Sequence, residues 1–230
     1  MMGSFVVKVT LAPADAVIPG PTVQLPRSSP RTDRARCSPA ARSVLPSSPV
    51  DLPSPERIWN DGRAVLRARW YLRSATRVGP RVRVWGAPSV TNKGTLMVGD
   101  RARLVSTMAT LEIGVGPGGV LDIGEDVFVN YGCSFGATKS IRIGAHSTIG
   151  PHVIMMDNDF HRLEPERRNE LPPSAPIVLE ENVWLGARVI VLRGVTIGAG
   201  SAIGAASVVA GDIPPRTVAA GVPARVIRSI

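Results

Sequence analysis

Between Leu179 and Val209 the sequence repeats every six residues. Taking every sixth residue gives an unbroken aliphatic series: Leu179, Leu185, Val191, Ile197, Ile203 and Val209. An α-helix cannot place these residues on one face, because six residues turn it by about 600° and leave them about 120° out of step. A three-sided coil can, since each hexad then forms one flat side whose aliphatic residue points inward. The repeat therefore predicts an all-β solenoid.

Two further positions of the hexad support this fold. The fourth residue after each aliphatic one is small or β-branched and is expected to fill the space beside it: Val183, Val189, Val195, Ser201 and Ser207. Glycine directly follows the aliphatic residue at Gly186, Gly198 and Gly204. We expect these glycines to supply the backbone conformations that a tight corner needs.

The composition fits one main solenoid domain. Aromatic residues make up only 4% of the chain, and there are 23 glycines. The net charge of +9 is typical of proteins that bind nucleic acid. We expect no such partner, because much of the excess charge lies in the first third, outside the repeats, and aromatic residues are not interleaved with it. Cys37 and Cys133 form neither a disulfide framework nor a metal site, and no stretch has the length of an integral membrane segment.

The chain divides into three parts. Residues 1–53 are expected to be poorly ordered, because prolines interrupt every candidate element, and the sequence assigns them no role. Residues 54–81 are expected to form a capping helix and a connector, and residues 82–230 the solenoid. Within it, the excursion loop at 156–176 breaks the hexads with polar residues and prolines. A long loop in a regular scaffold is where function is expected.

Ser54-Pro55-Glu56 is a helix-start signature, with a cap residue, a proline at the first helical position and an acid in the first turn. The predicted helix runs to about Arg73. Six apolar residues are expected on one broad face: Ile58, Trp59, Val65, Leu66, Trp70 and Leu72. Arginines cover much of the rest. We expect the helix to cap the open end of the solenoid; a basic surface helix for a membrane or a polyanion is the alternative.

Three stretches resemble the hexapeptide-repeat O-acetyltransferases, the family of maltose and galactoside acetyltransferases. They are Asp-Phe-His-Arg-Leu-Glu-Pro-Glu-Arg-Arg-Asn at 159–169, Glu-Asn-Val-Trp-Leu-Gly-Ala-Arg at 181–188 and Ala-Gly-Val-Pro-Ala-Arg-Val-Ile-Arg at 220–228. The resemblance implies a left-handed parallel β-helix, a homotrimer, and transfer of an acetyl group from acetyl-CoA to a hydroxyl of a sugar or glycosylated acceptor. It implies no metal. The acceptor and the length of the acyl group are left open.

By the same resemblance, His161 matches the loop histidine that acts as the catalytic base. The chemistry needs such a group, because a hydroxyl is a poor nucleophile until its proton is removed and imidazole suits that task near neutral pH. The alkoxide then attacks the thioester directly. Asp157, Asp159 and Glu164 are the candidates to orient His161.

Other family positions carry over to the acceptor and to CoA. Asn130 and Asp159 are candidate acceptor-binding residues, and Asn130 is equally compatible with an asparagine ladder at a solenoid corner. The family's acidic residue for gripping a sugar has no counterpart near Gly136. The candidate CoA-binding residues are Trp184, Gly186, Ala187, Ala205, Arg225 and Arg228. The arginines would meet phosphates through charge-assisted bonds.

Two other functions stay open at this point. A zinc enzyme of the γ-carbonic anhydrase type would need its histidines to converge, but His146 and His152 fall on neighbouring sides of one coil. A non-catalytic scaffold explains the repeats but not the loop. The apolar run Phe5-Val6-Val7 is too short for a signal peptide, and its positive charge, Lys8, follows the run instead of preceding it. We therefore expect a cytoplasmic location.

Overall fold

The computed structural model describes residues 55–230, with side chains from Asp61 onward. The segment expected to be poorly ordered, residues 1–53, lies outside the described residues. So do Ser54 and the side chains of Ile58 and Trp59.

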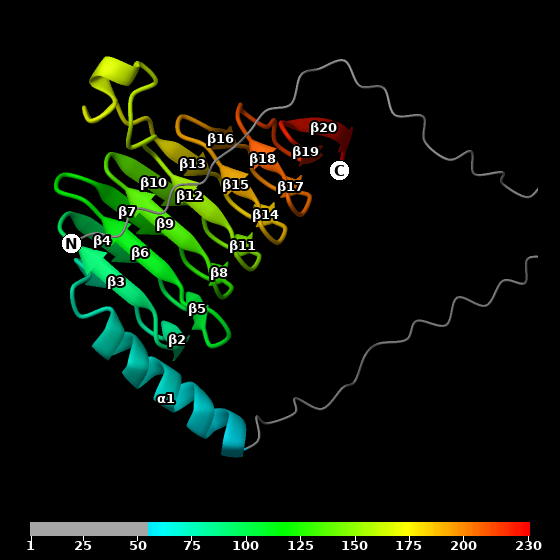
Figure 1. Cartoon of the computed structure of the whole chain (residues 1–230). Coiled ribbons are helices and arrows are strands. Elements are labelled where there is room, and N and C mark those ends of the chain that lie inside the picture. The colour runs from blue at the N-terminus through cyan, green and yellow to red at the C-terminus, as the bar shows by residue number, and fades with distance from the viewer. Residues whose placement is uncertain (1–54) are drawn as a thin grey trace, which may run out of the picture. The chain divides into compact units, whose positions relative to one another are not determined.

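The described chain is one α-helix followed by a solenoid of three sheets, whose strands run parallel except for the antiparallel β20 (Figure 1). Sheet A contains β1 (Arg77–Val78), β4 (Thr95–Val98), β7 (Val120–Ile123), β10 (Ser140–Ile143), β13 (Ile177–Leu179) and β16 (Thr196–Ile197). Sheet B contains β2 (Arg83–Gly86), β5 (Arg103–Ser106), β8 (Phe128–Val129), β11 (Thr148–Ile149), β14 (Trp184–Leu185), β17 (Ala202–Ile203), β19 (Thr217–Gly221) and β20 (Ala224–Ser229). Sheet C contains β3 (Ser89–Asn92), β6 (Glu112–Val115), β9 (Ser134–Ala137), β12 (Ile154–Met156), β15 (Ile190–Val191) and β18 (Val208–Val209).

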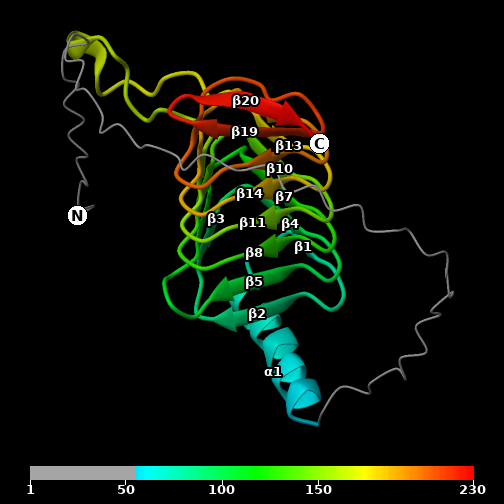
Figure 2. The same ribbon diagram turned by 90° about the vertical axis from the view of Figure 1, so that its right-hand side faces the viewer.

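The solenoid is left-handed. Sheet C faces the reader in Figure 1, and sheet B faces the reader in Figure 2, which shows the right-hand side. The chain passes from sheet A at the rear to sheet B and then to sheet C while it climbs toward the C-terminus. This turn is opposite to the usual right-handed crossover of parallel strands. The predicted left-handed parallel β-helix is therefore confirmed.

Three corners join the sheets, and we name each by the sheets that it connects. The AB corner consists of residues 79–82, 99–102, 124–127, 144–147, 180–183 and 198–201. The BC corner consists of residues 87–88, 107–111, 130–133, 150–153, 186–189 and 204–207. The CA corner consists of residues 93–94, 116–119, 138–139, 157–176 and 192–195. The excursion loop is thus one long CA corner.

The aliphatic residues of the hexads form the core. All six members of the Leu179–Val209 series are at most 2% exposed. Corresponding residues of successive coils lie in register, so that Ile143 pairs with Leu179 and Leu179 with Ile197 in sheet A. Each coil therefore buries its apolar residue against the coils before and after it, as the repeat predicts.

The reason for the corner glycines differs from the expectation. Gly186, Gly198 and Gly204 do not have a positive φ, whereas non-glycine residues such as Asn182 and Arg188 do. Close approach of the next coil requires these glycines instead. A Cβ on Gly186 would lie 2.7 Å from the backbone nitrogen of Ala205, and one on Gly204 would lie 2.8 Å from the Cβ of Ala220. Backbone spacing, rather than backbone conformation, selects glycine here.

The helix α1 (Pro55–Tyr71) begins at the predicted residue and packs against β2 at the N-terminal end of the solenoid. The predicted apolar face is partly wrong. Ala64, Ala68 and Leu72 are buried, while Leu66 and Trp70 are exposed. Small alanines let the helix lie close to the first coil, and this turns the larger apolar residues outward. In the part of the chain that the structure describes, no helix is long and apolar enough to cross a membrane.

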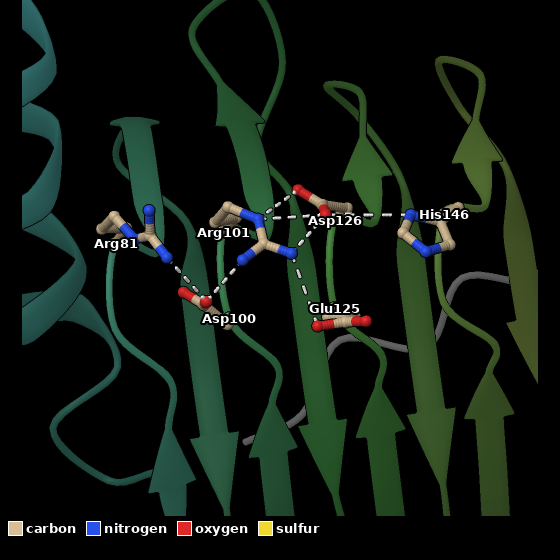
Figure 3. Close-up of polar contacts among 6 residues, drawn as sticks. All are labelled: Arg81, Asp100, Arg101, Glu125, Asp126 and His146. Atoms are coloured by element: carbon tan, nitrogen blue, oxygen red, sulfur yellow. Dashed lines mark hydrogen bonds and ion pairs between the residues drawn. The ribbon is translucent and has the colours of Figure 1, made fainter.

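An ion-pair network at the AB corner joins the first coils (Figure 3). The Nε of Arg101 donates to both carboxylate oxygens of Asp126, at 2.9 and 3.0 Å, and its Nη1 donates to Asp100 at 2.7 Å. Arg81 donates to the same oxygen of Asp100 at 3.1 Å. The hydrogen bond with Arg101 lowers the pKa of Asp126 below its ordinary value, and the same bond raises the pKa of Arg101.

This network predicts a pH dependence of stability. A carboxylate whose folded-state pKa is lowered contributes stability that is fully present above its unfolded pKa of about 3.9 and is lost as the pH falls through the folded value. Acidification from about pH 5 to about pH 2 should therefore lower the Tm of the wild type more than that of Arg101→Ala. Thermal unfolding across this range measures the difference. Parallel Tm curves for the two proteins would contradict the prediction.

Candidate active site

The excursion loop projects from the CA corner between β12 and β13 (Figure 1). It contains one short helix, η1 (Pro165–Arg167). Its outer end is held by ion pairs, in which Arg167 and Arg162 approach Glu170 at 2.7 and 3.2 Å. The hydrogen bond from Arg167 lowers the pKa of Glu170. These ion pairs connect residues within the tip of the loop.

Asp157 anchors the base of the loop to the solenoid. Its carboxylate is completely buried. It accepts hydrogen bonds from the backbone nitrogen of Thr138 at 2.8 Å, the Thr138 hydroxyl at 2.7 Å and the backbone nitrogen of Lys139 at 2.7 Å. The backbone oxygen of Asp157 also accepts from the nitrogen of Ala175 at 2.9 Å. Both ends of the loop are therefore fixed at one point of the CA corner.

Asn158 sets the direction of the residues that follow. Its buried side-chain amide donates to the carbonyl oxygen of Pro172 at 2.9 Å and to the Ser174 hydroxyl at 2.7 Å. Its side-chain oxygen accepts from the backbone nitrogen of Phe160 at 2.5 Å. Phe160 has a φ of +61°, which is costly for an aromatic residue and needs such support. This turn presents His161 at the surface.

The imidazole of His161 is exposed, and a backbone carbonyl orients it. Its Nδ1 lies 3.0 Å from the carbonyl oxygen of Arg168. A carbonyl oxygen can only accept, so Nδ1 carries a proton in this contact, and in the neutral ring the lone pair is then on Nε2. None of the three predicted carboxylates makes a hydrogen bond or an ion pair with the imidazole. Asp157 is committed to the base of the loop, and Glu164 makes no side-chain cap at η1.

The two candidate acceptor residues lie at different corners. Asp159 is in the excursion loop, and its carboxylate accepts from the Nε of Arg193 at 2.5 Å. Asn130 lies at the BC corner, where its side-chain oxygen accepts from the backbone nitrogen of Tyr131 at 2.9 Å. Among the described residues, no hydrogen-bond partner occupies the amide nitrogen of Asn130. That group is available to a substrate.

The outer surface of sheet C beside the loop is apolar. The thioether of Met156 lies over Gly136, in the space that a side chain there would need, and the Phe160 ring reaches within 3.8 Å of the same point. No acidic side chain occupies the position where the family would grip a sugar. The surface over Gly136, at the base of the loop, is therefore built from a thioether and a phenyl ring.

The candidate CoA residues gather on sheet B and the BC corner. Gly186 and Ala187 follow β14, and Ala205 occupies the same corner one coil further on. Trp184 is 60% exposed on sheet B, in register with Thr148 and Ala202. The small corner residues leave an open edge beside the exposed indole.

Arg225 and Arg228 are exposed on β20, which pairs antiparallel with β19 at the C-terminal end of sheet B. Their Nη1 atoms donate only to nearby backbone oxygens, of Ala224 and Ser229, each at 3.1 Å. Within residues 61–230 neither guanidinium has a carboxylate within ion-pair distance. Both cations are free to meet phosphate groups.

Cys133 does not offer a nucleophile at this corner. Its side chain is buried, its Sγ lies 3.2 Å from the carbonyl oxygen of Gly150, and burial raises the pKa of the thiol to about 11. A thiol with this pKa is almost entirely protonated at neutral pH. Acyl transfer through a cysteine intermediate is therefore disfavoured.

The structure does not bring all predicted residues together within one chain. His161 and Asp159 lie at the CA corner, while Asn130 and the CoA candidates lie at or near the BC corner. Sheet C separates these corners, and a strand of four residues spans about 13 Å. The histidines are also separated. His146 lies at the AB corner, His152 at the BC corner and His161 in the loop. Within the described part of the chain, no group of three His, Cys, Asp or Glu side chains is arranged so that it could hold a metal ion.

Several site residues had no clear signal in the sequence. The network of Thr138, Asn158 and Ser174 joins residues up to 36 positions apart, and the carbonyl of Arg168 has no side-chain signature at all. Arg193 belongs to a regular hexad, and nothing in the repeat indicates that it pairs with Asp159. Only the adjacent polar pair Asp157-Asn158, at the point where the repeat stops, marked the anchor.

Comparison with known proteins identifies relatives with the same repeat. The family model for the bacterial transferase hexapeptide (six repeats) matches residues 176–211. Galactoside O-acetyltransferase of Escherichia coli (strain K12) is 40% identical over 113 residues, which cover 49% of this chain and 56% of that protein. The Staphylococcus aureus (strain COL) protein named "Putative acetyltransferase SACOL2570" is 38% identical over 150 residues, covering 62% of this chain and 73% of that protein. The chain spans about half the length of the first curated relatives that it matches.

Solved structures agree with this similarity. The hexapeptide-repeat acetyltransferase VCA0836 of Vibrio cholerae O1 biovar eltor, complexed with acetyl coenzyme A, has a TM-score of 0.54 at 28% identity. The match covers 76% of this chain and 90% of that one. A galactoside acetyltransferase in complex with coenzyme A has a TM-score of 0.54 at 29% identity, covering 71% of this chain and 70% of that one.

The anchor of the excursion loop yields a stability prediction. Asp157→Asn replaces an acceptor of several buried hydrogen bonds with an amide whose N–H groups face other donors. It should lower the free energy of unfolding by about 1–3 kcal/mol. It should also speed hydrogen exchange of the loop backbone. Asp159→Asn is the matched control, because its ion pair is about half exposed and is worth less than about 1 kcal/mol. Equal effects of the two variants in denaturant unfolding would refute the anchoring role.

Proposed function

The chain belongs to the hexapeptide-repeat acetyltransferase family, and from this premise we propose that it is an acetyl-CoA-dependent O-acetyltransferase. The acceptor is a hydroxyl of a sugar or a glycosylated compound. The observation that carries the proposal is the free Nε2 of His161, exposed on a loop that is firmly anchored to the solenoid. Relatives that are named acetyltransferases, and solved structures with acetyl-CoA or CoA, support the donor.

His161 is the general base in this proposal. The Arg168 carbonyl accepts the Nδ1 proton, so that Nε2 of the neutral ring carries the lone pair that serves as the base. Nε2 takes the proton from the acceptor hydroxyl as the oxygen attacks the thioester carbonyl of acetyl-CoA. The resulting tetrahedral oxyanion collapses, the carbon–sulfur bond breaks, and the imidazolium returns the proton to the CoA thiolate. The products are the acetyl ester and free CoA.

Asn130 supplies a donor for the reaction. Its side-chain oxygen accepts from the Tyr131 nitrogen, so its amide N–H groups are left to donate to an acceptor hydroxyl or the oxyanion. A fixed donor at a developing negative charge lowers the barrier because it needs no reorganisation.

Acetyl-CoA lies along the BC corner in this proposal. The stacked corner residues Gly186, Ala187 and Ala205 give the narrow pantetheine arm a place against the coil, and Trp184 stands exposed beside them. Arg225 and Arg228 meet the phosphates at the C-terminal end. The reaction then takes place in the cytoplasm, where acetyl-CoA is supplied.

We further propose that the complete site forms between neighbouring subunits of a homotrimer. His161 lies at one corner of sheet C, while Asn130 and the proposed CoA site lie at or near the other. A second copy that places its BC corner against the excursion loop of the first would bring the Asn130 and CoA site of one subunit next to the His161 of the other.

The surface beside His161 favours one kind of acceptor. Met156 and Phe160 form an apolar wall where an acidic residue would otherwise grip a free sugar. A glycoside with an apolar group next to the reacting hydroxyl fits this wall better than a monosaccharide does, because the apolar group is removed from water on binding.

Release of free CoA thiol tests the proposed reaction. With acetyl-CoA and a panel of glycosides, turnover should depend on the acceptor, and glycosides with apolar groups should have lower KM values than free sugars. His161→Ala should lower kcat/KM by about 10²–10⁴-fold because the general base is lost. His146→Ala, a histidine at the AB corner, is the control and should retain full activity. A His161→Ala protein with normal turnover would rule out this role.

Mixed oligomers test the shared site. Ala205→Trp should block the proposed CoA path from its exposed corner, and His161→Ala should remove the base, so each variant alone is inactive. Co-expression with two different affinity tags isolates assemblies that contain both. If the site spans two subunits, these mixed assemblies recover part of the wild-type rate, because one subunit supplies the base and its neighbour an open CoA path. No recovery would place the whole site within one chain.

A further inference from the structure

We propose that the outer face of α1 binds a bilayer surface that carries anionic lipids. The outer face consists of Arg63, Leu66, Arg67, Trp70 and Arg73, at spacings that fall on one side of a helix and continue just past its end. All five side chains are exposed, and Leu66 and Trp70 are each 66% exposed. The inference is independent of the acetyl transfer proposed above.

The packing of α1 explains why this face is free. The seam that contacts the first coil is made by Ala64, Ala68 and Leu72. Figures 1 and 2 place the helix at the N-terminal end of the solenoid, with its other long side turned away from the strands. The two large apolar side chains of the outer face therefore contribute nothing to the core, although their exposure to water is unfavourable.

Among the described side chains, no acid pairs with the arginines of the outer face. Within residues 61–230, Arg63, Arg67 and Arg73 have no carboxylate within ion-pair distance, whereas Asp61, on the same helix, pairs with Arg83 at 3.5 Å. The guanidinium of Arg73 lies 5.1 Å from the centre of the Trp70 ring and donates to the Trp70 carbonyl at 3.0 Å. The exposed indole thus carries a cation over its ring.

This combination fits a membrane interface better than other partners. An amphipathic helix that lies in the interface buries Leu and Trp at the level of the headgroups while its arginines reach lipid phosphates. A second copy docked on the same face would set arginine against arginine. A nucleic acid would satisfy the arginines but would leave Leu66 in water. A bilayer with anionic headgroups satisfies both kinds of side chain.

Vesicle sedimentation of the full-length protein tests the proposal. The wild type should sediment with vesicles of phosphatidylcholine and phosphatidylglycerol in equal parts, and not with phosphatidylcholine alone. The double variant Arg63→Glu/Arg67→Glu and the double variant Leu66→Ser/Trp70→Ser should each reduce the bound fraction about tenfold or more, because charge and apolar insertion both contribute. Residues 1–54 are present in every protein, so any binding that they add cancels in the comparison.

Matched controls come from other exposed residues of the same type. Trp184→Ser and Arg216→Glu change an exposed tryptophan and an exposed arginine away from α1, and both variants should bind vesicles as the wild type does. Circular dichroism confirms that each α1 variant is folded. No binding to anionic vesicles, or equal loss in the control variants, would overturn the proposal. Tighter binding to duplex DNA that is insensitive to Leu66→Ser/Trp70→Ser would also overturn it and would assign the face to a polyanion.

Discussion

The structure depends on the stacking of each coil on the one before it. Backbone hydrogen bonds in register join corresponding strands, and the aliphatic residue of each hexad is buried against its equivalents in the neighbouring coils. Stacking at this spacing leaves no room for a Cβ at corner positions such as Gly186 and Gly204. It also fixes where every outward residue lies, because a residue's place in its hexad determines its sheet or corner. Three of the candidate CoA residues, Gly186, Ala187 and Ala205, are stacked at the BC corner for this reason.

The proposed chemistry arises where this regularity is interrupted. The excursion loop leaves the solenoid at the CA corner. The buried carboxylate of Asp157 anchors its start to Thr138 and Lys139, and the amide of Asn158 joins its two ends. Rigidity at the base allows a long loop to present one imidazole with a defined tautomer. The regular coils provide the second part of the proposed site, a row of small residues at the BC corner along which acetyl-CoA can extend. Sheet C lies between the two, which is why the proposed site needs a second subunit.

Much of the fold was predictable from the sequence because each coil repeats the same physical requirement. The period of six, the helix beginning at Pro55 and the position of the loop all follow from local patterns. The face of α1 did not, since a close approach to the first coil selects Ala64 and Ala68 over the larger Leu66 and Trp70. The partner of His161 could not be found either, because a carbonyl group from Arg168 carries no signature in the sequence. Contacts between loop residues far apart in the chain depend on how the loop closes, and the repeat does not encode that.

The most direct test of the account is a structure of the assembled protein with acetyl-CoA bound. If the active site is shared between subunits as proposed, the pantetheine arm runs along Gly186 and Ala205 of one subunit. The thioester carbonyl then faces the Nε2 of His161 from the neighbouring subunit. Acetyl-CoA bound at another corner, or a thioester remote from every His161, would contradict the proposed active site.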